Sequence, residues 1–394
     1  MMESKHYFMC GVGGSGMLPL ALILKAAGHR VDGSDRALDQ GRSAPKFDYL
    51  KAQGIGLFPQ DGSGVTSPGE IVVASAAVEE TVPDIVAARR VGASRMTRAR
   101  LLADLFNAAS LSVGVAGTSG KSTATAMIGW ILHRVGRDPT VMNGAVMKNF
   151  VTPDALFASA LVGKSGLFVS EVDESDGSIA EYNARIGVLT NISLDHKSMG
   201  ELRALFSGFA ARTDIAVLNL DNAETAALAR DLPAGKIITF GVDDKTAQIG
   251  AGNIVPGARG ISFVARDLGG ERSPVDLKTP GRHNVSNALA ALAATKALGV
   301  PFAEAARALD QFAGVKRRLD FIGEKAGVTV IDDFAHNPDK IAASLGTLHE
   351  FLGRLIVMFQ PHGFGPLKKM QDAFIDCFAH NLGRDDILLM PEPV

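Results

Sequence analysis

The sequence predicts an α/β protein in which apolar strands and helices alternate in three consecutive units. Two glycine-rich turns, at residues 11–16 and 117–123, each follow an apolar strand and precede an apolar helix. This is the order of a phosphate-binding strand–turn–helix unit. The chain of 394 residues is too long for one hydrophobic core, because domains commonly span ~100 to 200 residues. We therefore predict three domains, at residues 1–108, 109–314 and 315–394.

The composition argues against several classes of protein. Lys plus Arg number 40 and Asp plus Glu 42, which gives a net charge of -2, so we expect neither nucleic acid nor an anionic membrane surface as a partner. Cys10 and Cys377 lie far apart and form no metal-binding or disulfide pattern. The sequence shows no secretion signal, and no apolar run reaches the ~18 residues of a membrane span. We therefore expect a soluble, cytoplasmic protein.

The first unit has an apolar strand, a turn, an apolar helix and a second strand that ends in an acid. Gly11, Gly13 and Gly16 have the spacing GxGxxG, and Asp35 follows Gly16 by 19 residues. A dinucleotide-binding unit has this spacing, and its acid meets a ribose hydroxyl. Alone, the pattern specifies only a diphosphate at a helix N-terminus. An NAD-dependent oxidoreductase is therefore one of the alternatives that the first unit leaves open.

The second turn reads GTSGKST over residues 117–123. Gly117 and Gly120 let the backbone approach phosphate oxygens, Lys121 adds a positive charge, and Ser122 offers a hydroxyl to Mg2+. The turn follows an apolar strand and opens a helix, which is the context of a phosphate loop. The sequence therefore predicts a nucleotide phosphate site here.

Acidic and polar side chains follow two later apolar strands. Residues 170–178 read SEVDESDGS and include Glu171, and residues 190–196 read TNISLDH and end at His196. The carboxyl ends of parallel strands form the ligand-binding edge of an open sheet, and Mg2+ prefers one or two carboxylates with water and phosphate oxygens. We therefore expect Glu171 and His196 near the phosphate loop, although the acids alone also fit a solvated loop.

The rest of the chain continues the alternation. Residues 243–278 are rich in Gly and short alternating runs, which predicts a small antiparallel meander, and residues 284–299 predict a helix. A third strand-and-helix series starts near Val315 with only two or three strands. Two or three strands cannot bury both faces of a sheet well. We therefore expect the third domain to be small or incomplete.

Seven segments, in one order, resemble the Mur ligase family, the ATP-dependent amide-forming enzymes of peptidoglycan precursor synthesis. They are GVGGSGM with DGSD, GTSGKST, EVDESD, TNISLDH, PGRHNVSNALAA, FAGVKRRLD and DDFAHNP. The resemblance implies a Rossmann-like N-terminal domain that binds a UDP-muramyl substrate, a central P-loop ATPase domain and an incomplete Rossmann-like C-terminal domain.

The activity that the resemblance implies is formation of an amide bond on the lactyl carboxylate of UDP-N-acetylmuramate. The amine is L-alanine or, alternatively, the murein tripeptide L-Ala-D-Glu-meso-diaminopimelate, whose branch GVKRRLD and DDFAHNP resemble more. An oxidoreductase and a nucleotide-binding module without ligase activity are the remaining alternatives. The oligomeric state is not predicted.

The resemblance also assigns residues by position, and each residue type suits its role. The UDP substrate is expected at Gly11, Gly13, Gly14, Ser15, Gly16, Asp35 and Ser75. ATP is expected at Gly117, Thr118, Ser119, Gly120, Lys121, Ser122 and Thr123, with Asn284 and Asn287 at adenine, Arg318 at the γ-phosphate and Asp333 at the ribose. Mg2+ is expected at Ser122, Glu171 and His196, and the expected catalytic residues are Lys121, Glu171, His196 and Arg318.

Overall fold

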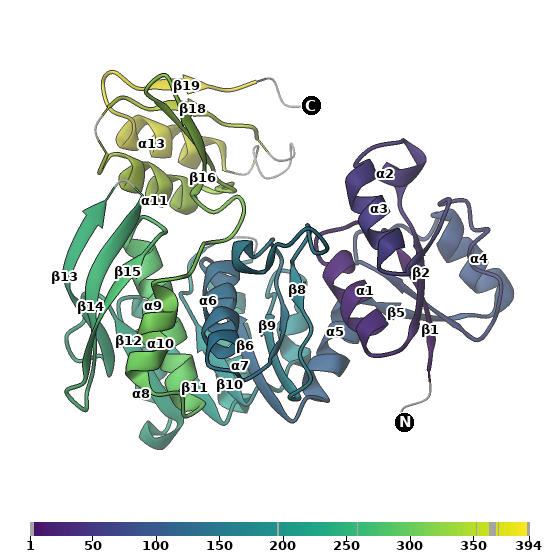
Figure 1. Cartoon of the computed structure of the whole chain (residues 1–394), viewed down its shortest axis with the longest axis horizontal. Coiled ribbons are helices and arrows are strands. Elements are labelled where there is room, and N and C mark those ends of the chain that lie inside the picture. Colours follow the sequence, from purple (N-terminus) through teal and green to yellow (C-terminus); the bar gives the residue numbers. More distant parts are fainter. Residues whose placement is uncertain are drawn as a thin grey trace.

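The computed structural model describes residues 4–194, 197–257, 259–351, 353–361, 368 and 370–391. Two large sheets and two strand pairs follow one another along the chain. In Figure 1 the N-terminal part (purple) lies to one side of the central sheet, and the C-terminal part (yellow-green) lies above the opposite end of that sheet. The predicted domain boundaries near residues 108 and 314 stay predictions.

The N-terminal sheet has five parallel strands in the order β3-β2-β1-β4-β5. The strands are β1 His6–Cys10, β2 Arg30–Ser34, β3 Gly56–Phe58, β4 Glu70–Ala74 and β5 Ser94–Thr97, and the helices are α1 Met17–Ala26, α2 Arg36–Asp39, α3 Ala44–Ala52, α4 Pro83–Val91 and α5 Arg98–Asn107. The chain leaves β1 toward β2 and later returns to the other side of β1 as β4. The strand order therefore reverses beside the glycine-rich turn, which is where open α/β sheets bind ligands.

The central sheet has ten strands in the order β15-β14-β13-β12-β11-β10-β6-β9-β7-β8. The strands are β6 Leu111–Ala116, β7 Thr140–Met142, β8 Ala160–Leu161, β9 Leu167–Glu171, β10 Ile186–Leu189, β11 Ile215–Asn219, β12 Ile237–Gly241, β13 Ile249–Gly257, β14 Gly260–Asp267 and β15 Arg272–Leu277. Pairing is parallel from β7 to β13 and antiparallel at β8, β14 and β15. The antiparallel meander predicted within residues 243–278 is thus confirmed.

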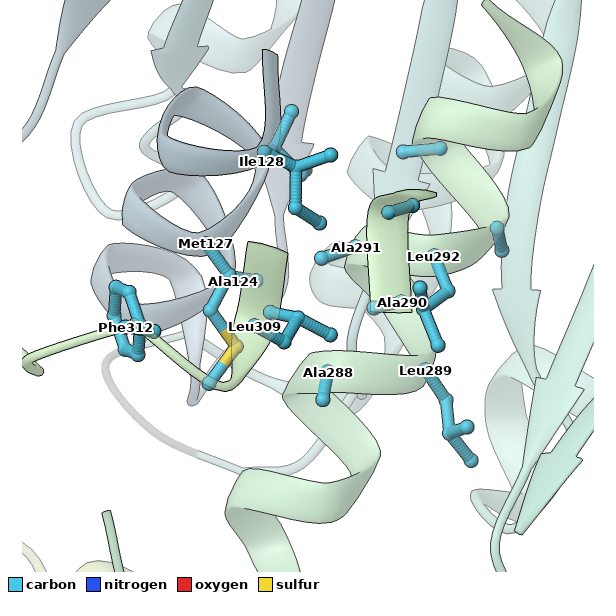
Figure 2. Close-up of a cluster of buried hydrophobic side chains, with 14 of the residues drawn as sticks. Ala124, Met127, Ile128, Ala288, Leu289, Ala290, Ala291, Leu292, Leu309 and Phe312 are labelled. Carbon is cyan, nitrogen blue, oxygen red and sulfur yellow. The ribbon is translucent and has the colours of Figure 1, made fainter. Parts of the chain in front are cut away.

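The helices of the central part are α6 Lys121–Arg134, α7 Met199–Arg212, α8 Ala223–Asp231, α9 Arg282–Ala297 and α10 Phe302–Leu309. Helix α9 confirms the helix predicted at residues 284–299, and its alanine and leucine side chains are buried all round. A helix that is apolar on every side belongs inside a protein. Figure 2 shows α9 beside α6, with Met127, Ile128 and Leu309 near it, and both helices pack on the central sheet. This packing fixes the start of α6 relative to the start of α9, where the candidate site lies.

The described residues of the C-terminal part include two strand pairs and the helices α11 Pro338–Leu348 and α13 Gln371–Asn381. The pairs are antiparallel β16 Asp320–Lys325 with β17 Val328–Asp332, and parallel β18 Ile356–Met358 with β19 Ile387–Leu389. Helices α11 and α13 enclose a small apolar core with Phe359. Ile356 and Met358 on the other face of their strand are 57% and 76% exposed, as expected for a small layer. Among the described residues no helix is long and apolar enough to cross a membrane.

Candidate active site

Two cavities lie side by side and share the residues at their common wall. The first, of about 390 Å³, lies between the N-terminal and central sheets, and the second, of about 550 Å³, lies between the central sheet and the C-terminal part. Lys121, Glu171 and Asp173 line both cavities. Groups bound in the two cavities would therefore meet at these three side chains.

The first glycine-rich turn forms one wall of the first cavity. Gly11, Gly14, Ser15 and Gly16 line it together with Ser75, as the sequence predicts for a substrate site. Gly13 and Asp35 are not among its lining residues.

The Asp35 carboxylate forms hydrogen bonds with the backbone of the turn and of α2. Its carboxylate accepts hydrogen bonds from the backbone N–H groups of Gly13, at 2.9 Å, and of Ala37, at 2.8 Å. The second of these bonds caps α2. Asp35 therefore ties the turn to the end of β2, and a direct contact of Asp35 with a ligand stays a prediction.

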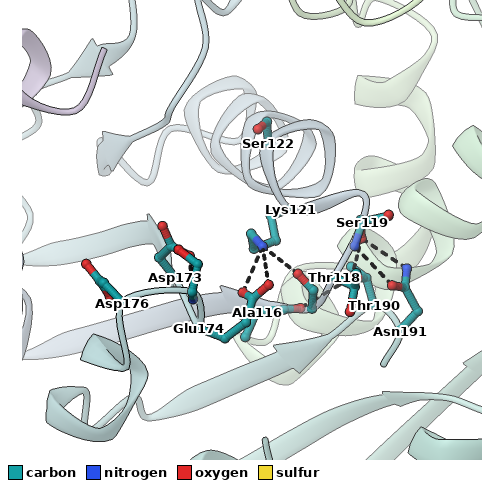
Figure 3. Close-up of polar contacts among 12 residues, drawn as sticks. Ala116, Thr118, Ser119, Lys121, Ser122, Asp173, Glu174, Asp176, Thr190 and Asn191 are labelled. Atoms are coloured by element: carbon teal, nitrogen blue, oxygen red, sulfur yellow. Dashed lines mark hydrogen bonds and ion pairs between the residues drawn. The ribbon is translucent and has the colours of Figure 1, made fainter. Parts of the chain in front are cut away.

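The phosphate loop joins β6 to α6 and is fastened to the segment after β10. Ser119 N–H donates to Asn191 Oδ1 at 3.0 Å, the Thr190 hydroxyl donates to Ser119 O at 2.6 Å, and the Thr118 hydroxyl donates to Ser193 O at 3.1 Å (Figure 3). Gly120 caps α6 without a side chain, so the positive N-terminus of α6 opens into the second cavity. The loop is thus held rigidly in an anion-binding conformation.

Gly120 shows why this loop needs glycine. It has a φ of +86°, a conformation that side chains with a Cβ rarely adopt. A Cβ placed there would overlap Asn287 Oδ1 of α9. The absence of a side chain at Gly120 therefore lets the phosphate loop lie directly against α9.

Lys121 is paired with an acid of its own chain. Its ammonium donates to Gly117 O at 2.6 Å and to the two carboxylate oxygens of Glu174 at 2.8 and 3.2 Å (Figure 3). The Lys121 and Glu174 side chains are only 18% and 5% exposed. Burial by itself raises the pKa of neighbouring Asp173, but hydrogen bonds from Ser175 and the charge of Lys121 hold this pKa below its ordinary value. Asp173 therefore stays negatively charged beside the phosphate loop, and we call residues 173–178 the acid loop.

Glu171 and Ser122 are the described members of the predicted metal set. Glu171 ends β9, accepts a hydrogen bond from Gly144 N–H at 2.7 Å, and lines the second cavity with Ser122. The Ser122 hydroxyl lies 3.5 Å from Arg318 Nη2. His196 lies outside the described residues. Among the described residues no cluster of three His, Cys, Asp or Glu side chains is placed to hold a metal ion.

A carboxylate and a hydroxyl fit a magnesium ion that takes its remaining ligands from phosphate and water. The donor set of Glu171 and Ser122 is therefore chemically suited to Mg2+ bound with a nucleotide.

The far wall of the second cavity is built by α9 and the C-terminal part. Asn284 and Asn287 are 4% and 6% exposed, and Asn287 Nδ2 donates to Asn284 Oδ1 at 3.2 Å. Asp333 accepts from Leu319 N–H at 3.0 Å and from the Ser344 hydroxyl at 2.6 Å. The guanidinium of Arg318 lies over the ring of Phe334, 5.2 Å from its centroid. The structure thus brings Asn284, Asn287, Arg318 and Asp333 to the cavity that holds the phosphate loop.

The sequence interpretation missed other residues of both cavities. His283 lines the second cavity beside Asn284. Although the residue is exposed at the cavity surface, desolvation by the surrounding protein atoms lowers the pKa of His283, and the charge of Asp333 partly offsets this effect. Its place in the segment PGRHN, next to the predicted Asn284, was a signal that could have identified it. Arg98 and Tyr182 line the first cavity, and no local pattern marks either of them.

Comparison with known proteins identifies the family. The family model described as Mur ligase family, catalytic domain matches residues 6–110, the Mur ligase middle domain matches 115–295, and the Mur ligase, glutamate ligase domain matches 317–382. UDP-N-acetylmuramate--L-alanine ligase of Agrobacterium fabrum is 36% identical over 395 residues, covering 97% of this chain and 80% of that protein. The chain belongs to the Mur ligase family. The resemblance inferred from the seven segments is confirmed.

Other Mur ligases agree with this assignment. The protein of the same name from Synechococcus sp. is 37% identical, covering 98% of this chain and 77% of that protein. The crystal structure of UDP-N-acetylmuramate-alanine ligase from Thermotoga maritima matches with a TM-score of 0.80 and 26% identity, over 98% of this chain and 90% of that chain. A murein peptide ligase from Psychrobacter arcticus shares the fold, with a TM-score of 0.77. The three-part α/β architecture is therefore that of a Mur ligase.

Proposed function

We propose that this protein is an ATP-dependent ligase that joins the lactyl carboxylate of UDP-N-acetylmuramate to the amino group of L-alanine. The curated relatives carry the name of this activity and match nearly the whole chain. The observation that carries the proposal is the common wall of Lys121, Glu171 and Asp173 between the two cavities. A phosphoryl donor in one cavity can meet a carboxylate in the other only at such a wall. The reaction would serve peptidoglycan precursor synthesis in the cytoplasm.

The first step transfers a phosphoryl group. A lactyl carboxylate oxygen attacks the γ-phosphorus of ATP, and the bond from this phosphorus to the β,γ-bridging oxygen breaks. ADP is the leaving group, and the carboxylate becomes an acyl phosphate. Because two anions must approach each other, Lys121 and Arg318 would neutralise the charge that develops. Both residues line the second cavity, and the rigid phosphate loop would hold the γ-phosphate in line.

The second step forms the amide. The free amine attacks the acyl carbon, the carbon–oxygen bond to phosphate breaks, and inorganic phosphate leaves with the bonding electrons while the nitrogen loses a proton. Asn284 and Asn287 would bind adenine, Asp333 the ribose, and the first glycine turn with Ser75 the UDP group. These contacts would position both substrates during the two steps.

We assign the magnesium site to Ser122 and Glu171, with His196 as a further proposed ligand outside the described residues. Mg2+ bound there would neutralise phosphate charge. The Ser122 hydroxyl near the start of α6 and the Glu171 carboxylate at the end of β9 would hold the cation.

The murein tripeptide is the alternative acceptor. The segments GVKRRLD and DDFAHNP favour it, because they resemble the branch of the family that uses the tripeptide. Both acceptors require the same phosphoryl transfer, so they are separated by the second step alone.

The test supplies ATP, Mg2+ and UDP-N-acetylmuramate with L-alanine, with the tripeptide, or with no acceptor, and measures phosphate release and product mass. We expect acceptor-dependent phosphate release and a product heavier by alanine minus water. A product formed only with the tripeptide would move the assignment to the alternative. ATP binding without release under any condition would instead indicate a nucleotide-binding module without ligase activity.

A further inference from the structure

Arg98 lies against the first glycine-rich turn although it follows β5, the edge strand of the N-terminal sheet. It is the first residue of α5, and a Cβ placed on Gly16 would lie 3.1 Å from its Cδ and 3.4 Å from its Nη1. Gly16 caps α1, whose first turn contains no acid. The guanidinium therefore lies beside the N-terminus of α1, which carries a partial positive charge. Two positive groups so close together favour a bound anion next to them.

The partners of Arg98 within the protein are weak. Its side chain is 20% exposed, and its closest acid, Asp176 of the acid loop, lies at 3.6 Å from Nη2. A charge-assisted hydrogen bond is shorter, at about 2.7 to 2.9 Å. Across the part of the chain that the structure describes, the guanidinium donates no hydrogen bond. A mostly buried cation with unused donors is costly, and a bound anion would remove that cost.

Lys121, which also lines the first cavity, already forms an ion pair. Lys121 lies at the far wall and is paired with Glu174, next to Glu171 where phosphoryl transfer is proposed. Arg98 instead borders Gly16, within the turn that suits a diphosphate. Its planar fork of donors also suits phosphate oxygens.

We propose that Arg98 binds the diphosphate of the sugar nucleotide, and that Asp176 holds the guanidinium in the cavity until this ligand replaces it. The inference rests on the proposed function, since it names a residue for the UDP group of that substrate. Arg98 is then a substrate-binding residue, and Asp176 a positioning residue that acts through it.

The experiment measures binding of UDP-N-acetylmuramate by calorimetry, without ATP, to the wild type, Arg98→Ala, Arg98→Lys and Arg100→Ala. Arg100 is the control because it is on the same helix, is 61% exposed and pairs with Asp104. We expect Arg98→Ala to raise the dissociation constant roughly 10- to 100-fold, which is the worth of a charged hydrogen bond. Arg98→Lys should raise it less, because the charge remains. Arg100→Ala should bind the sugar nucleotide like the wild type.

Asp176→Asn supplies a second, independent arm. It should lower the dissociation constant, because the ligand no longer competes with the carboxylate, and this effect should disappear when Asp176→Asn is combined with Arg98→Ala. A merely structural ion pair would give the opposite sign, or equal effects in both backgrounds.

The outcomes distinguish failure of the proposed role of Arg98 from failure of the proposed ligase function. Unchanged binding by both Arg98 variants, with wild-type turnover, would overturn this inference and leave the ligase function standing. A wild type that binds no UDP-N-acetylmuramate would overturn both. If Arg98→Ala does not fold, Arg98→Lys and Asp176→Asn decide the question.

Discussion

The ammonium of Lys121 lies 2.8 Å from one carboxylate oxygen of Glu174 and 3.2 Å from the other. The lysine of the phosphate loop is therefore paired with an anion of the same chain. A phosphate group that binds Lys121 has to displace Glu174 from a mostly buried pair. We therefore expect Glu174 to be a determinant of nucleotide affinity, a role that the acidic sequence pattern alone does not single out.

Glu174→Gln should therefore tighten ATP binding. We expect the dissociation constant for ATP to fall roughly 3- to 10-fold, equivalent to about 1 kcal/mol for the lost pair. The melting temperature of the ligand-free protein should fall, because Lys121 loses its counter-ion. Calorimetry and thermal unfolding measure the two effects. Glu224→Gln, which breaks the exposed pair with Arg203, is the control. Weaker ATP binding by Glu174→Gln would mean that Glu174 helps to hold the nucleotide.

Lys121→Ala should abolish turnover without abolishing binding of the sugar nucleotide. We expect kcat to fall by roughly 100-fold or more, the usual cost of removing one group that stabilises developing charge. Steady-state phosphate release gives kcat, and calorimetry gives the dissociation constant for UDP-N-acetylmuramate. Lys164→Ala, at an exposed position, should behave like the wild type. Normal turnover by Lys121→Ala would remove this residue from its proposed role.

Gly120→Ala should weaken ATP binding more than backbone strain alone explains. Both Gly120 and Gly136 have positive φ, at +86° and +74°, but a Cβ at Gly136 meets no atom within 4 Å. Gly136→Ala should therefore cost only the ~1 to 2 kcal/mol of a left-handed backbone. Gly120→Ala adds the overlap with Asn287 and should also raise KM for ATP at least several-fold. Thermal unfolding and KM for the two variants, measured side by side, check this; equal values would contradict it.

Asp386 should contribute to stability above about pH 4 and lose that contribution in more acidic solution. Hydrogen bonds from Leu355 N–H, His349 and Gly383 N–H lower its pKa from 3.8 to about 2. A carboxylate whose pKa is lower in the folded state stabilises the protein above its unfolded pKa, and the effect is lost as the pH falls toward the folded pKa. Denaturant unfolding of the wild type and Asp386→Asn should therefore differ at pH 6, and the difference should shrink between about pH 4 and pH 2. A constant difference would contradict the assignment.

The sequence predicted those features that depend on local patterns. The turns at residues 11–16 and 117–123 were recognisable because glycine spacing, a preceding apolar strand and a following helix are all contiguous in the chain. The meander at β13–β15 was recognisable by its short alternating runs. Strands β7 and β8 were missed because three and two residues carry no period.

The contacts that cross the chain could not be predicted in this way. Lys121 pairs with Glu174, and Arg98 approaches both Gly16 and Asp176, over separations that no sequence period reports. Asp35 shows the converse limit. Its spacing from Gly16 predicts a ligand contact, which stays a prediction, and the spacing did not report the two backbone partners that the structure gives its carboxylate, Gly13 in the turn and Ala37 in α2.

The acid loop supplies the counter-ion of Lys121 through Glu174 and that of Arg98 through Asp176. A ligand that displaces either acid releases the same short segment from one of its two anchors. Reciprocity follows from thermodynamics: the factor by which ATP changes the affinity for the sugar nucleotide equals the factor by which the sugar nucleotide changes the affinity for ATP. We therefore expect any coupling between the two cavities to be transmitted through the acid loop, which carries an acid for each of the two cations.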